Sequence, residues 1–92
     1  NIKDIFENYY EFERGEVFDL AKQLNDTSTD ATKTLEEMQN YMLSLLKSNL
    51  DNKHVQIKLM HDLEAVELAK KQISSNVAPL NAFENLCLDI IK

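Results

Sequence analysis

The chain has 92 residues, enough for one small hydrophobic core and too few for two. Its 16 Asp and Glu residues outnumber its 10 Lys and Arg residues, which gives a net charge of −6 at pH 7. A surface of that charge repels phosphate backbones, so direct contact with nucleic acid is not expected. No apolar run approaches the roughly 18 residues that a membrane span needs, so we expect a soluble protein with no membrane contact.

Reactive chemistry has few candidates in this sequence. Cys87 is the only cysteine, so no disulfide can form within the chain, and its apolar neighbours indicate a buried structural thiol in a reducing, cytoplasmic setting. A single glycine excludes a glycine-rich phosphate loop, and a single cysteine excludes paired-cysteine zinc motifs. We therefore expect no catalytic residue, cofactor or metal here.

Helices are predicted along the whole chain. One Gly and one Pro, with apolar residues spaced by three and four, predict an all-α fold, a compact bundle of about five helices. The first helix is expected to end near Gly15, which can adopt a left-handed C-cap at no steric cost. The second is expected from about Glu16 to Leu24. The apolar stripe of the first helix comprises Ile2, Ile5, Phe6, Tyr9 and Phe12, and that of the second comprises Val17, Leu20, Ala21 and Leu24.

Two polar segments predict the next breaks. Residues 25–30 are rich in side chains that bond their own backbone, and Thr29 or Asp30 is suited to cap a third helix of about 20 residues. Residues 48–53 supply the following break, after which a fourth helix of similar length is expected. Lys70 lies on the stripe of that helix and is expected to bury its methylenes while its ammonium reaches water. The third stripe comprises Leu35, Met38, Met42, Leu45 and Asn49, and the fourth comprises Val55, Leu59, Leu63, Val66, Lys70 and Ile73.

The last helix is expected to begin at Pro79, because a first-turn position leaves the N–H that proline lacks unpaired anyway. Asn76 or the backbone around it is expected to close the preceding turn. The apolar face of this helix comprises Leu80, Phe83, Cys87 and Ile90, widened by Leu86 and Ile91. Such a face is wide for a helix with one neighbour. The residues that could close the bundle or contact a partner are Leu80, Phe83, Leu86 and Ile90.

One pair of residues has a spacing that suits metal binding. His61 and Glu64 lie three residues apart on a predicted helix, with His54 upstream, so they could present ligands on one face. No second pair completes such a site, and the other acids resemble a solvated helix face, with no carboxylate marked as buried. A small helical metal-binding sensor domain is kept as an alternative because of the spacing of His61 and Glu64.

The end of the chain carries a more specific pattern. Residues 63–92, LEAVELAKKQISSNVAPLNAFENLCLDIIK, resemble the C-terminal end of bacterial DNA polymerase III clamp-loader subunits, where a long helix leads through an Asn-Val-Asn-Pro turn into a leucine-rich final helix. Ala78 stands where that family has its second Asn. Among the subunits, the delta-prime type fits best, with gamma or tau as the alternative. The matching positions are Leu68, Ile73, Asn76, Val77, Pro79, Phe83, Glu84, Leu86 and Leu88.

This resemblance implies that residues 1–92 are a single helical collar domain, which holds subunits together, at the end of a longer protein whose ATPase-type domains lie outside this sequence. Its partners would be the other clamp-loader subunits, joined in a ring. The domain would not be an enzyme, and its parent would be an accessory subunit of the DNA-directed DNA polymerase holoenzyme, a nucleotidyltransferase, in DNA replication. A free-standing helical adaptor with a homodimeric face is a further alternative.

Overall fold

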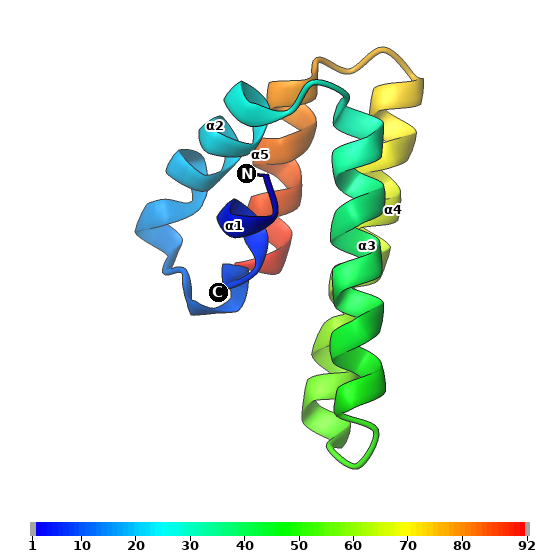
Figure 1. Ribbon diagram of the computed structural model, residues 1–92. Helices are drawn as coiled ribbons and strands as arrows, with labels where there is room; N and C mark the ends of the chain where they lie inside the picture. The colour runs from blue at the N-terminus through cyan, green and yellow to red at the C-terminus, as the bar shows by residue number, and fades with distance from the viewer. Residues whose placement is uncertain (1, 92) are drawn as a thin grey trace.

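Five α-helices, joined by short turns, make up most of the chain (Figure 1). This computed structural model describes residues 2–91, and over that range the predicted all-α fold of about five helices is confirmed. Two 3₁₀ turns lie between the first two helices. The helices are α1 (Ile2–Phe6), α2 (Val17–Thr27), α3 (Ala31–Ser48), α4 (Lys53–Ser74) and α5 (Pro79–Ile90), and the 3₁₀ turns are η1 (Tyr9–Glu11) and η2 (Arg14–Glu16).

The N-terminal segment differs from its prediction. Instead of one helix that ends at a left-handed Gly15, the chain forms the short α1 and then two 3₁₀ turns, and Gly15 does not have a positive φ. A local capping box holds the second turn, since the backbone N–H of Glu13 donates to Oε1 of Glu16 over 2.9 Å. The predicted aromatic stripe is still used, because Phe6 and Tyr9 are both buried.

Side-chain caps begin the two long helices. The predicted cap at Asp30 is present, since its Oδ1 accepts the backbone N–H of Lys33 at the start of α3 over 3.2 Å. Asn52 does the same for α4, with its Oδ1 accepting the N–H of Val55 over 3.2 Å. Each cap satisfies a backbone donor that has no partner within the helix. The loop before α3 is shorter than the predicted residues 25–30, because α2 continues to Thr27.

The helices pack around one core. Helices α3 and α4 form a long hairpin, α5 contacts both α2 and α4, and α1 contacts α2 and α3 (Figure 1). No helix within residues 2–91 combines the length and the apolar character needed to cross a membrane. The largest fully buried side chains come from all five helices and η1: Tyr9, Phe6, Phe83, Leu20, Leu24, Leu35, Met38, Met42, Leu86, Ile90, Val17 and Val66.

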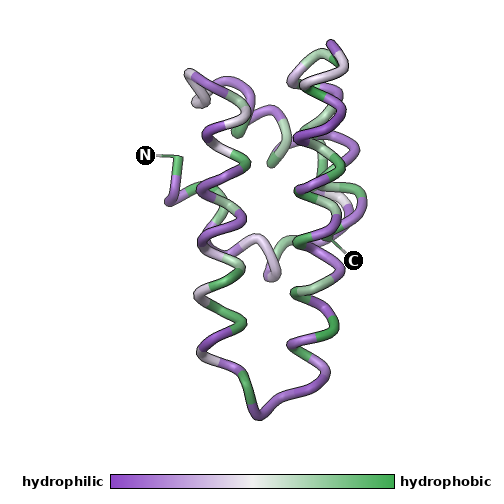
Figure 2. Tube along the Cα trace, turned by 90° about the vertical axis from the view of Figure 1, so that its right-hand side faces the viewer, coloured by the Kyte–Doolittle hydropathy of each residue, from purple (hydrophilic) through white to green (hydrophobic). Residues whose placement is uncertain are grey.

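The far half of the α3–α4 hairpin extends beyond the rest of the molecule (Figures 1 and 2). We call residues 43–58 the arm; it contains the end of α3, the connecting turn and the start of α4. No residue in this range is buried. The arm nevertheless exposes large apolar side chains, with Leu50 at 71% and Ile57 at 68% of full exposure. Most of the bundle's core therefore lies beside the other half of the hairpin, and the arm is left as a surface.

Replacement of Leu86 by Ala is expected to lower the free energy of unfolding by about 2–5 kcal/mol, because it leaves a cavity between packed helices. The matched change Leu88→Ala, on the exposed side of the same helix, is expected to change it by no more than about 0.5 kcal/mol. Urea denaturation followed by circular dichroism measures both. Equal losses in the two variants would contradict the assignment of the inner face of α5.

Candidate functional site

The turn between α4 and α5 has a defined hydrogen-bond pattern. Asn76 is the one described non-glycine residue with a positive φ, at 69°. Its backbone N–H donates to the carbonyl of Ile73 over 3.0 Å, and that of Val77 donates to the carbonyl of Gln72 over 2.9 Å. This is the Schellman arrangement, in which the left-handed residue is usually Gly and sometimes Asn. Pro79 is then the first residue of α5, as predicted.

Helix α5 presents two different faces. The predicted residues Phe83, Leu86 and Ile90 are each at most 1% exposed and lie in the core, so these three close the bundle. Leu80 is 37% exposed and lies on the outer side with Leu88, which is 41% exposed and was not among the predicted contact residues. Because they are eight residues apart, these two leucines share a helix face. A neighbouring protein could reach this outer pair without opening the bundle.

A buried charged cluster lies where α4, α5 and η1 meet. Asp62 is 0% exposed. Its Oδ2 accepts a hydrogen bond of 2.5 Å from the Tyr9 hydroxyl, and the Lys58 ammonium donates to both carboxylate oxygens over 2.7 and 2.6 Å. The same ammonium donates to the carbonyl of Ile90 over 2.7 Å and lies 5.5 Å from the centre of the Tyr9 ring.

Each contact in this cluster satisfies a group that would be costly to leave alone. A buried carboxylate needs both a counter-charge and hydrogen-bond donors. Lys58 supplies the charge, and it also partners a carbonyl in the last turn of α5, where cations are favoured. The pKa of Tyr9 is raised above its ordinary value, first by burial and then by its hydrogen bond to Asp62. The cluster is a structural tie between three segments rather than an exposed acid or base.

The sequence prediction did not identify this cluster. Asp62 had been grouped with the solvated acids, although it lies three residues after Leu59 and four before Val66 on the buried stripe of α4. Lys58, four residues earlier, is the partner that this position requires. The sign that could have revealed the cluster is therefore a carboxylate on an apolar stripe with a lysine at i−4.

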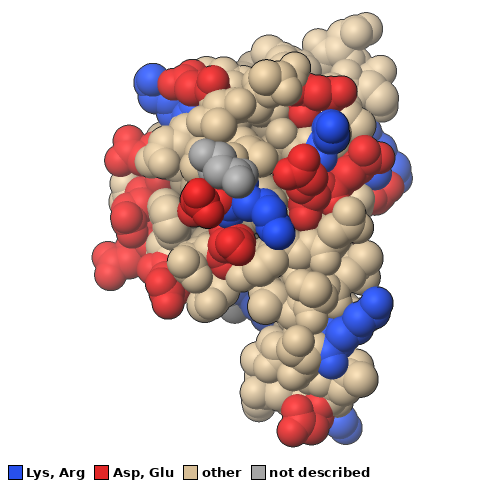
Figure 3. Space-filling model, in the orientation of Figure 1, with Lys and Arg blue, Asp and Glu red and all other residues tan. Residues whose placement is uncertain are grey.

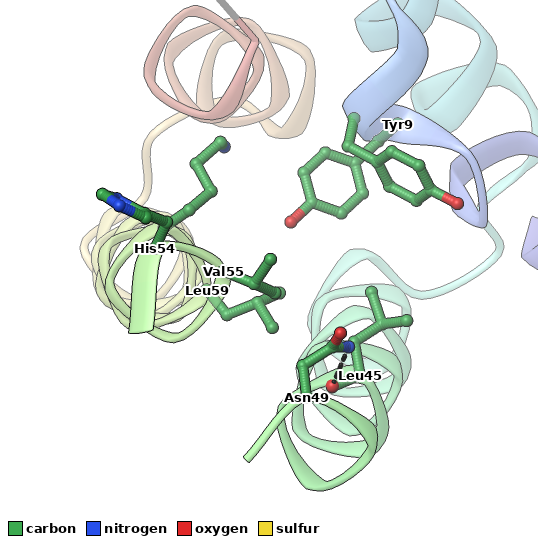
Figure 4. Close-up of a pocket in the computed structure, with 8 residues that line it drawn as sticks. Tyr9, Leu45, Asn49, His54, Val55 and Leu59 are labelled. Atoms are coloured by element: carbon green, nitrogen blue, oxygen red, sulfur yellow. Dashed lines mark hydrogen bonds between the residues drawn. The ribbon is translucent and has the colours of Figure 1, made fainter. Parts of the chain in front are cut away.

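A pocket of about 440 Å³ opens where the arm meets the rest of the bundle (Figure 4). Leu45 and Asn49 reach it from α3 and the end of that helix, while Val55 and Leu59 reach it from α4. Its wall is mainly apolar and aromatic, which is typical of binding pockets. We call it the arm pocket, and the residues that line it are Tyr9, Tyr10, Leu45, Asn49, His54, Val55, Lys58 and Leu59.

Of the three candidate metal ligands, His54 and His61 line one shallow hollow, and Glu64 is not among its lining residues. Nδ1 of His61 lies 3.4 Å from Oδ1 of Asp62, a carboxylate already occupied by two other donors. His54 borders the arm pocket with its ring turned outward (Figure 4), and Glu64 is exposed. Within residues 2–91, no three His, Cys, Asp or Glu side chains are grouped closely enough to hold a metal ion.

Cys87 is buried in the core, as the sequence predicted. Burial, with a smaller contribution from the charge of Glu84, raises the pKa of its thiol to about 12. Since the thiolate is the nucleophilic form, this thiol is unreactive at neutral pH.

Loss of the Tyr9 hydroxyl or of the Asp62 carboxylate is expected to destabilise the fold. Tyr9→Phe should lower the free energy of unfolding by about 1–3 kcal/mol, because it removes a donor to a buried acceptor. Asp62→Ala should lower it by about 3–5 kcal/mol, because it leaves the Lys58 ammonium without its counter-charge. Urea denaturation of both single variants and the double variant measures the coupling, and the double variant should lose less than the sum. Asp51→Ala, at an exposed carboxylate, is the matched control, and strictly additive losses would contradict the tie.

The burial of Cys87 is expected to make the free energy of unfolding fall at alkaline pH. In the unfolded chain the thiol has its ordinary pKa of 9.0, whereas in the folded chain its pKa is about 12. Between these values the unfolded state loses the proton first, so stability falls as pH rises, by up to about 1.4 kcal/mol per pH unit. Cys87→Ala should fall less steeply over this range in denaturation measured at several pH values. Parallel curves for the two proteins would show that the thiol titrates equally in both states.

Comparison with known proteins gives no relative for this chain. No protein-family model, no curated protein and no solved structure matches it. A function therefore has to be proposed from its own residues and geometry.

Proposed function

We propose that this chain is the collar domain of a bacterial DNA polymerase III clamp-loader subunit, of the delta-prime type or, as the alternative, gamma or tau. The domain holds the subunit in a ring with the other clamp-loader subunits while the clamp is loaded in DNA replication, in the cytoplasm. It performs no catalysis itself. ATPase-type domains of the same polypeptide lie outside the 92 residues, and the whole protein is an accessory subunit of the polymerase holoenzyme.

The observation that carries this proposal is the turn from α4 into α5. The resemblance to clamp-loader subunits lies in residues 63–92, and its least common feature is the Asn-Val-x-Pro turn between two helices. Here Asn76 takes the left-handed position that ends α4, and Pro79 begins α5. The Asn and the Pro of the motif therefore each have a physical task in this chain, which supports reading the motif as more than a chance match of helix-forming residues.

The surface supports a role in protein contact. Leu80 and Leu88 expose an apolar pair on the outer face of α5, and the arm exposes further large apolar side chains. The net charge of −6 is unfavourable for nucleic acid. A domain that meets neighbouring subunits needs apolar outer faces on a stable bundle, and both are present.

Co-expression with the other clamp-loader subunits of the source organism tests the proposal. The full reading frame, tagged, should co-purify with those subunits and elute with them in size-exclusion chromatography. The double variant Leu80→Ser/Leu88→Ser should keep its circular dichroism spectrum but weaken the complex about tenfold or more, since truncated apolar anchors are the costly losses at interfaces.

Asp89→Asn, an exposed change on the same helix but on the side away from Leu80, is the matched control and should leave the complex intact. A full-length protein that folds but purifies without any of these subunits would overturn the proposed function. A stable complex that tolerates the double leucine variant would keep the function but place the contact elsewhere.

A further inference from the structure

The arm pocket is a hollow with an apolar wall, in which Tyr9 and Leu59 are buried, Leu45 and Val55 are partly buried, and Tyr10 is 55% exposed. It is lined by Leu45, Val55 and Leu59 beside the rings of Tyr9 and Tyr10, and no acidic residue lines it. Leu50 and Ile57, also on the arm, add exposed apolar area. Apolar patches of this kind on a small protein commonly mark contact sites.

The charge of the arm indicates what kind of surface would cover it. Residues 43–58 hold Lys47, Lys53 and Lys58 against the single acid Asp51, a net charge of +2 in a chain whose total is −6. Lys58 also faces the buried carboxylate of Asp62, which leaves Lys47 and Lys53 as the exposed cations. The exposed charged residues of the arm are thus Lys47 and Lys53 against Asp51, a net charge of +1 in an acidic domain, and an acidic partner surface is favoured.

A surface with the complementary properties exists on the same chain. Residues 11–19, which we call the acidic flank, expose four acids and one base, Arg14, together with Phe18, whose exposure is 58%. Lys22, one turn further along α2, is paired with Asp26 over 2.8 Å. Figure 3 shows Asp and Glu gathered along the side of the molecule that α2 forms. The four exposed acids are Glu11, Glu13, Glu16 and Asp19.

Within one molecule, Glu11 at the near end of the acidic flank shares η1 with Tyr9 and Tyr10 of the arm pocket, whereas Phe18 lies further away on α2. In Figure 1, α2 and the α3–α4 hairpin lie on opposite sides of α1 and α5, and α5 packs directly against both α2 and α4. Insertion of Phe18, which lies on α2, into the arm pocket therefore requires two molecules.

We propose that the arm pocket binds Phe18 and the acidic flank of a second copy of this chain, in a head-to-tail contact. The Phe18 ring occupies the apolar space between the arm and the tyrosines, and the flanking carboxylates face Lys47 and Lys53. Such a contact uses different surfaces on the two copies, so it leaves one pocket and one flank free and can add further copies. This inference is independent of the proposed function, which concerns other subunits.

Complementation of two variants tests this contact. Phe18→Ser removes the inserted ring but keeps the pocket, and Val55→Glu puts a carboxylate in the pocket but keeps the flank. In sedimentation velocity at low salt, the wild-type chain should associate more as its concentration rises, and added salt should weaken that association. Each variant alone should self-associate about tenfold more weakly or worse. An equimolar mixture should form a dimer, because each variant supplies the surface that the other lacks.

Lys53→Glu, at an exposed position, replaces the pocket variant if Val55→Glu lowers the helical content. Lys71→Glu, an exposed change on α4 outside the arm, is the matched control and should associate as the wild-type chain does. A wild-type chain that stays monomeric at every concentration would overturn the proposal. A mixture that stays monomeric would also overturn it, since only a contact between unlike surfaces can be restored by mixing.

Discussion

The buried carboxylate of Asp62 is the constraint on which the arrangement of this bundle depends. It is fully buried. Its partner Tyr9 lies 53 residues earlier in the chain, and its partner Lys58 lies in the preceding turn of α4. Lys58 also binds the last turn of α5. Because an unpaired buried charge costs several kcal/mol, η1, α4 and α5 must meet at this point. The arm begins at Lys58, one helical turn before Asp62.

Much of the helical framework could be predicted from the sequence, because capping and periodicity are local properties. Asp30 and Pro79 begin their helices as expected. The segment around Gly15 was predicted wrongly because two local signals compete there: a glycine suited to a left-handed helix end, and the reciprocal contact between Glu13 and Glu16 that forms a 3₁₀ turn instead. Local signals identify where a helix can stop, but the packing of Phe6 and Tyr9 decides which stop is used.

The candidate site was predicted only in part, for a related reason. The period of α5 correctly grouped Phe83, Leu86 and Ile90, but it could not separate these buried positions from Leu80, which is 37% exposed. A hydrophobic period shows that a helix has an apolar face. How many residues of that face are buried depends on which helices pack against it. The arm pocket and the Asp62 tie combine residues from distant parts of the chain, so no single stretch of sequence contains them.

The position of α5 between α2 and α4 has a consequence for how the chain folds. The α3–α4 hairpin is made of contacts between adjacent helices, which form quickly, whereas contacts between α2 and α5 join helices separated by that hairpin. Helix α5 follows the other four along the chain, so on the ribosome the part of α2 that packs against α5 stays uncovered until α5 has emerged, although α1 can already contact α2. During synthesis the nascent chain therefore exposes the α5-binding side of α2, and this apolar surface is available to a chaperone.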